Sequence, residues 1–137
     1  MEHFNSCSML YAPCFMNIYH DLILDHYRNP RNHGSLKKAT HHAETFNPIC
    51  GDRLQMDIMV KNDIIEDVRF SGAGCAISQA SASLLSEHIK KKPLEEVRAI
   101  KPQDVLKLLG VTLSPVRLKC GLLSLETLKK ALQQKAK

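Results

Sequence analysis

The residues of this sequence best suited to chemistry are its five cysteines, three of which share one local setting. Each of these three lies beside a glycine, in a loop or at the expected start of a helix: Cys50, Cys75 and Cys120. A cysteine at a helix N-terminus faces unpaired N–H groups and the positive end of the helix dipole, which favours the thiolate. We expect Cys75 and Cys120 to lie at such positions. The adjacent glycines would let the backbone approach a bulky ligand closely; they are Gly51, Gly74 and Gly121.

Asp52 is a further candidate ligand, because it follows Cys50 by two positions in the same loop. Three thiolates and one carboxylate can hold zinc tetrahedrally, and thiolates also bind iron–sulfur clusters. A single weaker oxygen ligand suits a cargo that must leave again. The three cysteines are, however, tens of residues apart, which is not the spacing of a zinc knuckle. Three small buried hydrophobic side chains are therefore the alternative interpretation.

Residues 1–15 contain the other two cysteines, Cys7 and Cys14, and differ from the rest of the chain. No Lys or Arg precedes their apolar stretch, so they lack the basic start of a signal peptide. We therefore expect a cytoplasmic protein with reduced thiols. We interpret residues 1–15 as a disordered extension or a misplaced start, with Met16 as a second possible start. Residues 16–137 are then one domain.

Composition excludes several classes of protein. The chain has 137 residues, a formal net charge of +5, 44% hydrophobic residues and 5% aromatic residues without any Trp. No apolar run is long enough to span a bilayer. The basic residues are scattered and aromatic stacking residues are few, so we expect no nucleic-acid binding, and an acidic protein partner fits the charge equally well. Nucleotide-binding loops, nucleophile elbows and zinc-protease helices are not found in the sequence.

Two segments of alternating polarity predict the strands that position these residues. Residues 53–61 and 64–70 alternate apolar and polar side chains about a turn at Asn62–Asp63, which predicts an antiparallel hairpin. In the second segment we expect Ile64, Val68 and Phe70 on one side. Residues 43–49 would add a third strand at an edge, because Pro48 disfavours a central position.

Most of the predicted helices follow the strands. We expect a first helix over residues 17–27, a second from Cys75 to Ile89, and short helices opened by Pro93 and Pro102. Residues 112–119 would form a connector that contains Pro115, and a last helix would run from Cys120 to Lys135. Strands first and helices afterwards indicate the α+β class, with a small three-stranded antiparallel sheet covered by helices.

Four segments together form a pattern more specific than any single cysteine. They are Asp25–Gly34, Asn47–Asp52, Gly72–Ser83 and Ser114–Cys120. Through them the chain resembles the U-type iron–sulfur cluster scaffold family, which includes IscU, SufU and the N-terminal domain of NifU. The resemblance covers nearly everything from Ile18 to the last helix. It implies a SufE/NifU-like fold in which the three cysteine loops converge at one exposed end.

The resemblance also implies roles for the candidate residues. Cys50, Cys75 and Cys120 would be ligands of a transient [2Fe–2S] cluster or of Zn²⁺. Asp52 matches the family aspartate, which is a zinc ligand in some members and eases cluster release in others. A pyridoxal-phosphate-dependent cysteine desulfurase would deliver sulfur as a persulfide. The acceptor would be Cys120 by analogy with IscU or Cys50 by analogy with SufU, and apo iron–sulfur proteins would receive the cluster.

Three departures from the family pattern leave alternatives open. Lys119 stands where IscU-type members usually have a histidine, immediately before the third cysteine. SufU-type members lack that histidine too. The stretch between Cys75 and Cys120, however, has no room for the extra segment usual in SufU. A cluster scaffold, a zinc-bound sulfur shuttle and a structural zinc module therefore all stay open. Residues Leu113 to Arg117 keep part of the segment that IscU offers to a heat-shock chaperone, and the alternative is a Pro-containing connector.

Overall fold

The structure is a computed structural model that describes residues 13–48, 51–110 and 113–133. The expectation of a disordered extension or misplaced start falls largely on residues 1–12, outside the described residues. The described part of the chain contains three strands and five helices: α2 (Pro13–Arg28), β1 (His41–Asn47), β2 (Asp52–Lys61), β3 (Ile64–Ala73), α3 (Ala76–Ile89), α4 (Leu94–Arg98), α5 (Pro102–Leu109) and α6 (Pro115–Gln133). None of the helices within these ranges is long and apolar enough to cross a bilayer.

The strands form one antiparallel sheet in the order β1-β2-β3, as expected from the alternating sequence. Asn62 and Asp63 join β2 to β3 with φ angles of 54° and 60°. Positive φ at both positions matches the twist of an antiparallel hairpin, and Asn and Asp tolerate it better than most residues. β1 is an edge strand, which is consistent with Pro48 directly after it.

The prediction for the start of β3 was wrong. Ile64 is exposed, whereas Ile65, Val68 and Phe70 are fully buried. The register shifts at Met59/Val60, so that one residue of β3 has no opposite partner in β2. Such a bulge reverses which side of the sheet the following side chains face, and strict alternation therefore fails across it.

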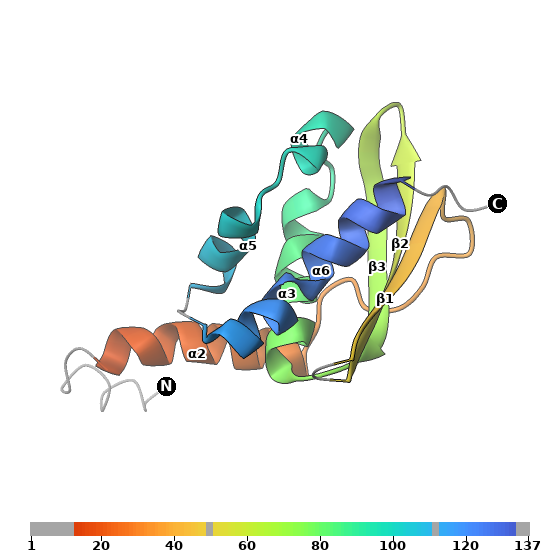
Figure 1. Ribbon diagram of the computed structural model, residues 1–137. Helices are drawn as coiled ribbons and strands as arrows, with labels where there is room; N and C mark the ends of the chain where they lie inside the picture. Colours follow the sequence, from red (N-terminus) through yellow and green to blue (C-terminus); the bar gives the residue numbers. More distant parts are fainter. Residues whose placement is uncertain (1–12, 49–50, 111–112, 134–137) are drawn as a thin grey trace.

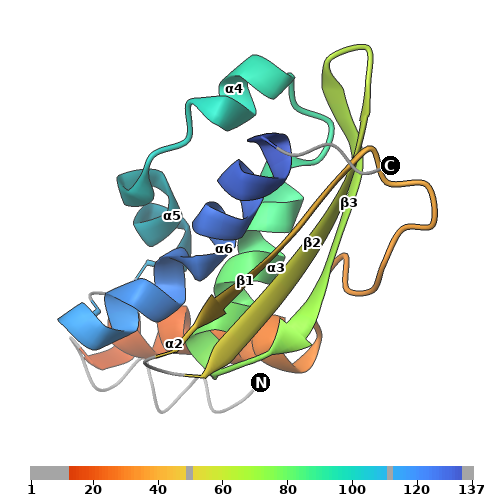
Figure 2. The same ribbon diagram turned by 45° about the vertical axis from the view of Figure 1, so that its right-hand side comes forward.

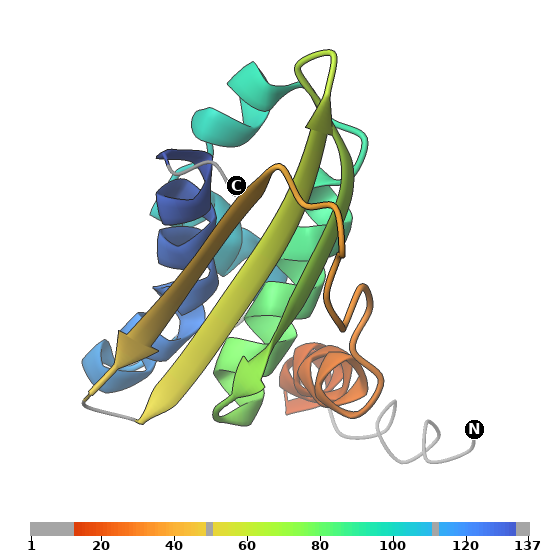
Figure 3. The same ribbon diagram turned by 90° about the vertical axis from the view of Figure 1, so that its right-hand side faces the viewer.

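Helices cover one face of this sheet (Figures 1 and 2). α3 and α6 pack against each other, and the core between them and the sheet includes Ile58, Leu85 and Leu128. On the opposite face the segment between α2 and β1 crosses the strands (Figure 3), where the backbone N–H of Leu36 donates to Asp57 Oδ2. The same segment follows the free edge of β3, since Gly34 N–H donates to the carbonyl of Phe70. The predicted α+β fold is confirmed.

The last helix begins earlier than predicted. α6 starts at Pro115, so the expected connector over residues 112–119 and a helix start at Cys120 were both wrong. Proline suits the first turn of a helix, where its missing N–H has no partner to lose. Ser114 precedes it, and its Oγ accepts the N–H of Arg117 at 3.4 Å, as a helix-capping side chain does. Cys120 therefore lies in the second turn of α6.

The first helix also begins before its predicted start. α2 starts at Pro13 rather than at Asn17, again with proline in the first turn. It packs chiefly against α3. Figure 1 shows α2 at the end of the sheet where β3 leads into α3.

Candidate metal or cluster site

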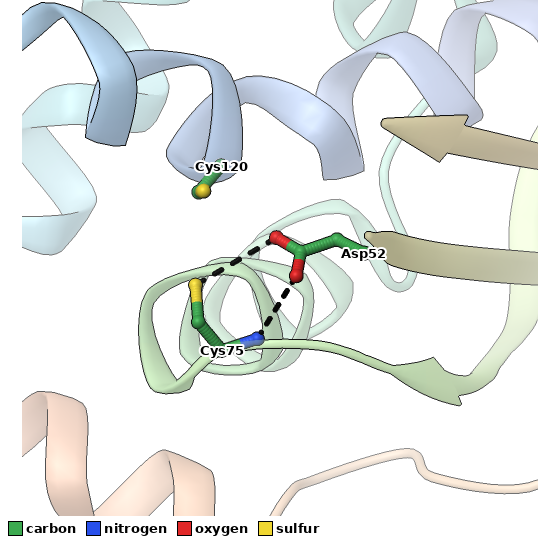
Figure 4. Close-up of side chains that lie close together, drawn as sticks. All are labelled: Asp52, Cys75 and Cys120. Carbon is green, nitrogen blue, oxygen red and sulfur yellow. Dashed lines mark hydrogen bonds between the residues drawn. The ribbon is translucent and has the colours of Figure 1, made fainter. Parts of the chain in front are cut away.

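Three potential ligands from distant parts of the chain meet at one end of the sheet. Asp52 is the first residue of β2, Cys75 directly precedes α3, and Cys120 lies in α6 (Figure 4). Their carboxylate oxygen and two sulfur atoms all lie within 4.8 Å of one another. Sulfur atoms bonded to one tetrahedral zinc at about 2.3 Å are separated by roughly 3.8 Å. Small side-chain movements would therefore let one ion contact all three.

Asp52 is fixed by hydrogen bonds to the start of α3. Its Oδ1 accepts the backbone N–H of Cys75 at 3.2 Å, and its Oδ2 accepts the thiol of the same residue at 3.7 Å. The residue is only 2% exposed. A buried carboxylate is stable only with such partners or with a cation, and this one has room for a cation beside the two sulfurs.

Cys75 occupies the position expected for it. It is the N-cap residue of α3, with extended backbone angles of φ −76° and ψ 169°, and its thiol is partly exposed. Its sulfur thus lies at the positive end of the helix dipole. Cys120, in contrast, is fully buried within α6, so the helix terminus expected to favour its thiolate does not exist.

Of the three glycines, Gly74 lies close to side chains of the candidate site, and its approach to a ligand stays a prediction. A Cβ at this position would lie 2.5 Å from Ser78 Oγ and 2.9 Å from Asp52 Oδ1. Gly51 has open space around its Cα and a φ of 75°, so it serves the turn. Gly121 packs against Leu113 and Leu109 and is a helix-packing residue. Gly51 lines the candidate cavity, so its approach to a ligand stays a prediction, whereas Gly121 is not part of that lining.

The three candidate ligands line an open cavity of about 430 Å³. The lining consists of Gly51, Asp52, Ala73, Gly74, Cys75, Arg117 and Cys120. Arg117 is the functional candidate that the sequence analysis did not assign to the site. It lies three residues before Cys120, hence on the same face of α6, and this becomes visible only when the helix starts at Pro115. Lys119 is exposed.

Cys50, the remaining predicted ligand, lies outside the described residues, and its role stays a prediction. Its neighbour Gly51 lines the cavity and donates its N–H to the carbonyl of Asn47 at 2.7 Å. Among the described residues, Asp52, Cys75 and Cys120 are the one group of three His, Cys, Asp or Glu side chains with metal-binding proximity. His26, which belongs to one of the family-like segments, is instead buried and bonded through Nδ1 to Ser83 Oγ at 2.7 Å.

The chain thus combines a three-stranded antiparallel sheet with two thiols and one carboxylate that converge at its end. A family model described as NifU-like N terminal domain matches residues 18–137. The chain therefore belongs to this family.

Several relatives cover most of the chain. The chain is 36% identical over 130 residues to the zinc-dependent sulfurtransferase SufU of Bacillus subtilis (strain 168), with 82% of this chain and 88% of that protein covered. It is 38% identical over 118 residues to the iron–sulfur cluster assembly scaffold protein IscU of Escherichia coli (strain K12), with 83% and 91% covered. A putative iron–sulfur cluster assembly scaffold for the SUF system from Fervidobacterium islandicum AW-1 has a similar structure. The TM-score is 0.70 at 31% identity, and 81% of this chain and 93% of that one are covered.

Proposed function

We propose that this protein is an iron–sulfur cluster assembly scaffold that builds a transient [2Fe–2S] cluster and passes it to apo-proteins. One observation carries the proposal: Asp52, Cys75 and Cys120 bring their ligand atoms within 4.8 Å of one another. They do so in a cavity open to solvent, where a cargo can enter and leave. Relatives named as cluster assembly scaffolds support the same function.

The ligands would be the thiolates of Cys50, Cys75 and Cys120 and the carboxylate of Asp52. Thiolates bind both iron and zinc, whereas a carboxylate oxygen is a harder ligand that suits reversible binding. These four anionic groups carry more negative charge than a dipositive cargo can neutralise. The excess negative charge is energetically unfavourable in a partly buried cavity. The guanidinium of Arg117, which lines the cavity, would offset part of that excess.

Sulfur would arrive from a cysteine desulfurase as a persulfide. An acceptor thiolate attacks the outer sulfur of the donor persulfide, the sulfur–sulfur bond of the donor breaks, and the donor cysteine leaves as a thiolate. We keep Cys120 and Cys50 as the candidate acceptors. Cys120 lines the open cavity but has no surface exposed to water, so attack by this residue requires a local movement that exposes its sulfur.

Reconstitution tests the scaffold function directly. Incubation with ferrous iron, cysteine, a cysteine desulfurase and a dithiol reductant should produce a labile cluster that absorbs visible light, because the dithiol reduces persulfide sulfur to the sulfide of the cluster. Cys75→Ser and Cys120→Ser should each abolish most of this absorbance, and Cys7→Ser and Cys14→Ser serve as matched controls. Absorbance that is lost with the control variants but persists in Cys75→Ser and Cys120→Ser would contradict the proposal.

A zinc-bound sulfur shuttle is the second candidate function. The combination of thiolates with the buried carboxylate of Asp52 suits zinc, and a relative is named as a zinc-dependent sulfurtransferase. In this mechanism zinc would mask the acceptor thiolate until the desulfurase displaces one ligand. The freshly purified protein should then contain one zinc per chain, stimulate desulfurase turnover strongly and carry a persulfide detectable by mass spectrometry. Equal stimulation by zinc-free protein would remove the metal from this mechanism.

A heat-shock chaperone would be a further partner, through Leu113 to Arg117. Ser114, Pro115 and Arg117 are exposed, which allows contact. The first turn of α6 begins within this segment. A chaperone that grips an extended peptide would therefore have to unwind that turn, three residues away from Cys120, and this would loosen the site.

A further inference from the structure

The hydroxyl of Ser78 lies beside the sulfur of Cys75. Ser78 is 1% exposed and follows Cys75 by three positions, on the same face of α3. Its Oγ is 3.9 Å from Cys75 Sγ and donates to the backbone carbonyl of Cys75 at 3.1 Å. The backbone of Gly74 closes the other side, because a Cβ there would lie 2.5 Å from this oxygen.

Metal binding reverses the hydrogen-bonding role of the Cys75 sulfur. Without a metal the thiol can donate its proton either to Asp52 Oδ2 or to Ser78 Oγ. A metal-bound cysteine has lost that proton, so its sulfur can only accept. Of these two side chains, the Asp52 carboxylate has no proton to give, whereas the Ser78 hydroxyl has one.

The hydroxyl can follow this reversal with little movement. Its proton points at the Cys75 carbonyl in the present structure, and rotation about the Cβ–Oγ bond turns it toward the sulfur. The carbonyl loses little, because bonds from a serine to a carbonyl of the preceding turn contribute little to helix stability. A hydrogen bond to an ionised acceptor is stronger than the neutral one it replaces.

We propose that Ser78 is a positioning residue that donates an O–H···S hydrogen bond to the Cys75 thiolate when the site is loaded. This inference rests on the proposed function, because it requires Cys75 to be a ligand. The bond holds the Cys75 side chain in the ligand rotamer and withdraws electron density from its sulfur. Partners of this kind typically change metal affinity ten- to a hundredfold and tune the electronic properties of the centre.

The test uses Zn²⁺ and Co²⁺ as probes of the full chain. In Ser78→Ala the Zn²⁺ affinity, measured by competition with a chelating dye, should fall about tenfold. The sulfur-to-cobalt charge-transfer band of the Co²⁺ form should shift as well. Ser78→Thr keeps a hydroxyl that can make the same backbone bond, and it should restore both the affinity and the band position. The melting temperature of the metal-free protein shows whether each variant is folded.

Ser86→Ala is the matched control. Ser86 is also fully buried on α3 and donates to the carbonyl three residues before it, that of Ser83, at 2.7 Å. It lies two helical turns beyond Ser78, so its removal should leave the Zn²⁺ affinity and the cobalt band unchanged. An affinity within twofold of the wild type and an unshifted band in Ser78→Ala would overturn the inference.

Cys75→Ser separates this inference from the proposed function. If Cys75 is a ligand, Cys75→Ser weakens the charge-transfer band of the Co²⁺ form. A clear effect of Cys75→Ser without an effect of Ser78→Ala refutes only the role of Ser78. No effect of Cys75→Ser on the cobalt spectrum refutes Cys75 as a ligand, and with it the proposed site.

Discussion

The side chain of Asp52 can serve the site both without and with a bound ion. Both of its oxygens accept hydrogen bonds from Cys75, one from the backbone and one from the thiol. Loading removes the thiol proton, so Oδ2 becomes available to a cation while the backbone bond to Oδ1 can stay. The carboxylate thus stays in place at the cavity wall, which reduces the side-chain entropy that Asp52 loses when an ion binds.

Gly74→Ala tests how closely this arrangement is packed. The new methyl group would lie within 3.0 Å of Ser78 Oγ and Asp52 Oδ1, so the carboxylate must shift. We expect a stability loss of about 1–3 kcal/mol and a marked loss of zinc retained after purification. Thermal melts and metal analysis measure the two effects.

Gly34→Ala is the control for backbone damage alone. Gly34 has a φ of 134° with open space around its Cα, so the substitution is strained but does not reach the site. It should lower the melting temperature and leave the zinc content unchanged. Normal zinc content in Gly74→Ala would show that the site tolerates the shift of Asp52.

At the scale of elements, α2 is held on α3 by a buried polar contact. His26 of α2 is 3% exposed, and its Nδ1 lies 2.7 Å from Ser83 Oγ. That oxygen also accepts the N–H of Arg31 at 2.9 Å, so one serine joins the helix and the segment after it to α3. The arrangement suits a neutral ring whose Nδ1 accepts the serine proton.

Acid should therefore weaken the docking of α2. Burial, with a smaller contribution from the charge of Arg31, lowers the pKa of His26 below the ordinary 6.5, while Glu87 and Asp25 act in the opposite direction. At a pH between the pKa of His26 in the folded protein and its ordinary pKa in the unfolded chain, the unfolded chain binds the proton more readily. The contribution of His26 is thus fully present above pH 6.5 and is lost as the pH falls through the folded value.

Urea unfolding between pH 7.5 and 5 measures this effect. The slope due to one proton cannot exceed about 1.4 kcal/mol per pH unit. His26→Gln should be less stable at pH 7.5, and the dependence of its unfolding free energy on pH should be flatter. An equal slope in the variant and the wild type would assign the acid sensitivity to other groups.

At the scale of the whole molecule, the candidate site joins three elements that are distant in sequence. Asp52 starts β2, Cys75 precedes α3 and Cys120 belongs to α6, so a bound ion would crosslink the sheet to both covering helices. An ion that binds the folded chain and not the unfolded one stabilises the fold by mass action.

Zinc removal should accordingly lower the melting temperature. At free zinc one hundredfold above the dissociation constant, the stabilisation is about 2.7 kcal/mol, or roughly 10 °C for a domain of this size. Calorimetry with and without a chelator measures the shift. Cys75→Ser should show little of it, and unchanged melting of the wild type after complete zinc removal would contradict a crosslinking metal. Complete unfolding after zinc removal would instead indicate a structural zinc module.

Local patterns were sufficient for much of the architecture. Alternating residues in β2 predicted its buried face, and Asn62–Asp63 predicted the hairpin, because both depend on neighbours in the sequence. The motif around Cys75 placed that residue correctly at the start of α3. Pro115 misled the prediction, because a proline can open a helix as well as interrupt one, and only the chain around it decides between the two.

Long-range packing decided the remainder. The β-bulge that exposes Ile64 and buries Ile65 arises from the pairing of two strands, which neither strand encodes alone. Arg117 reaches the cavity because α6 begins at Pro115 and packs beside α3. The contact between Ser78 and Cys75 belongs to a candidate site only because Asp52, from another element, lies beside the same sulfur. Such contacts depend on how separate elements pack in three dimensions, and the spacing of residues along the chain does not determine that packing.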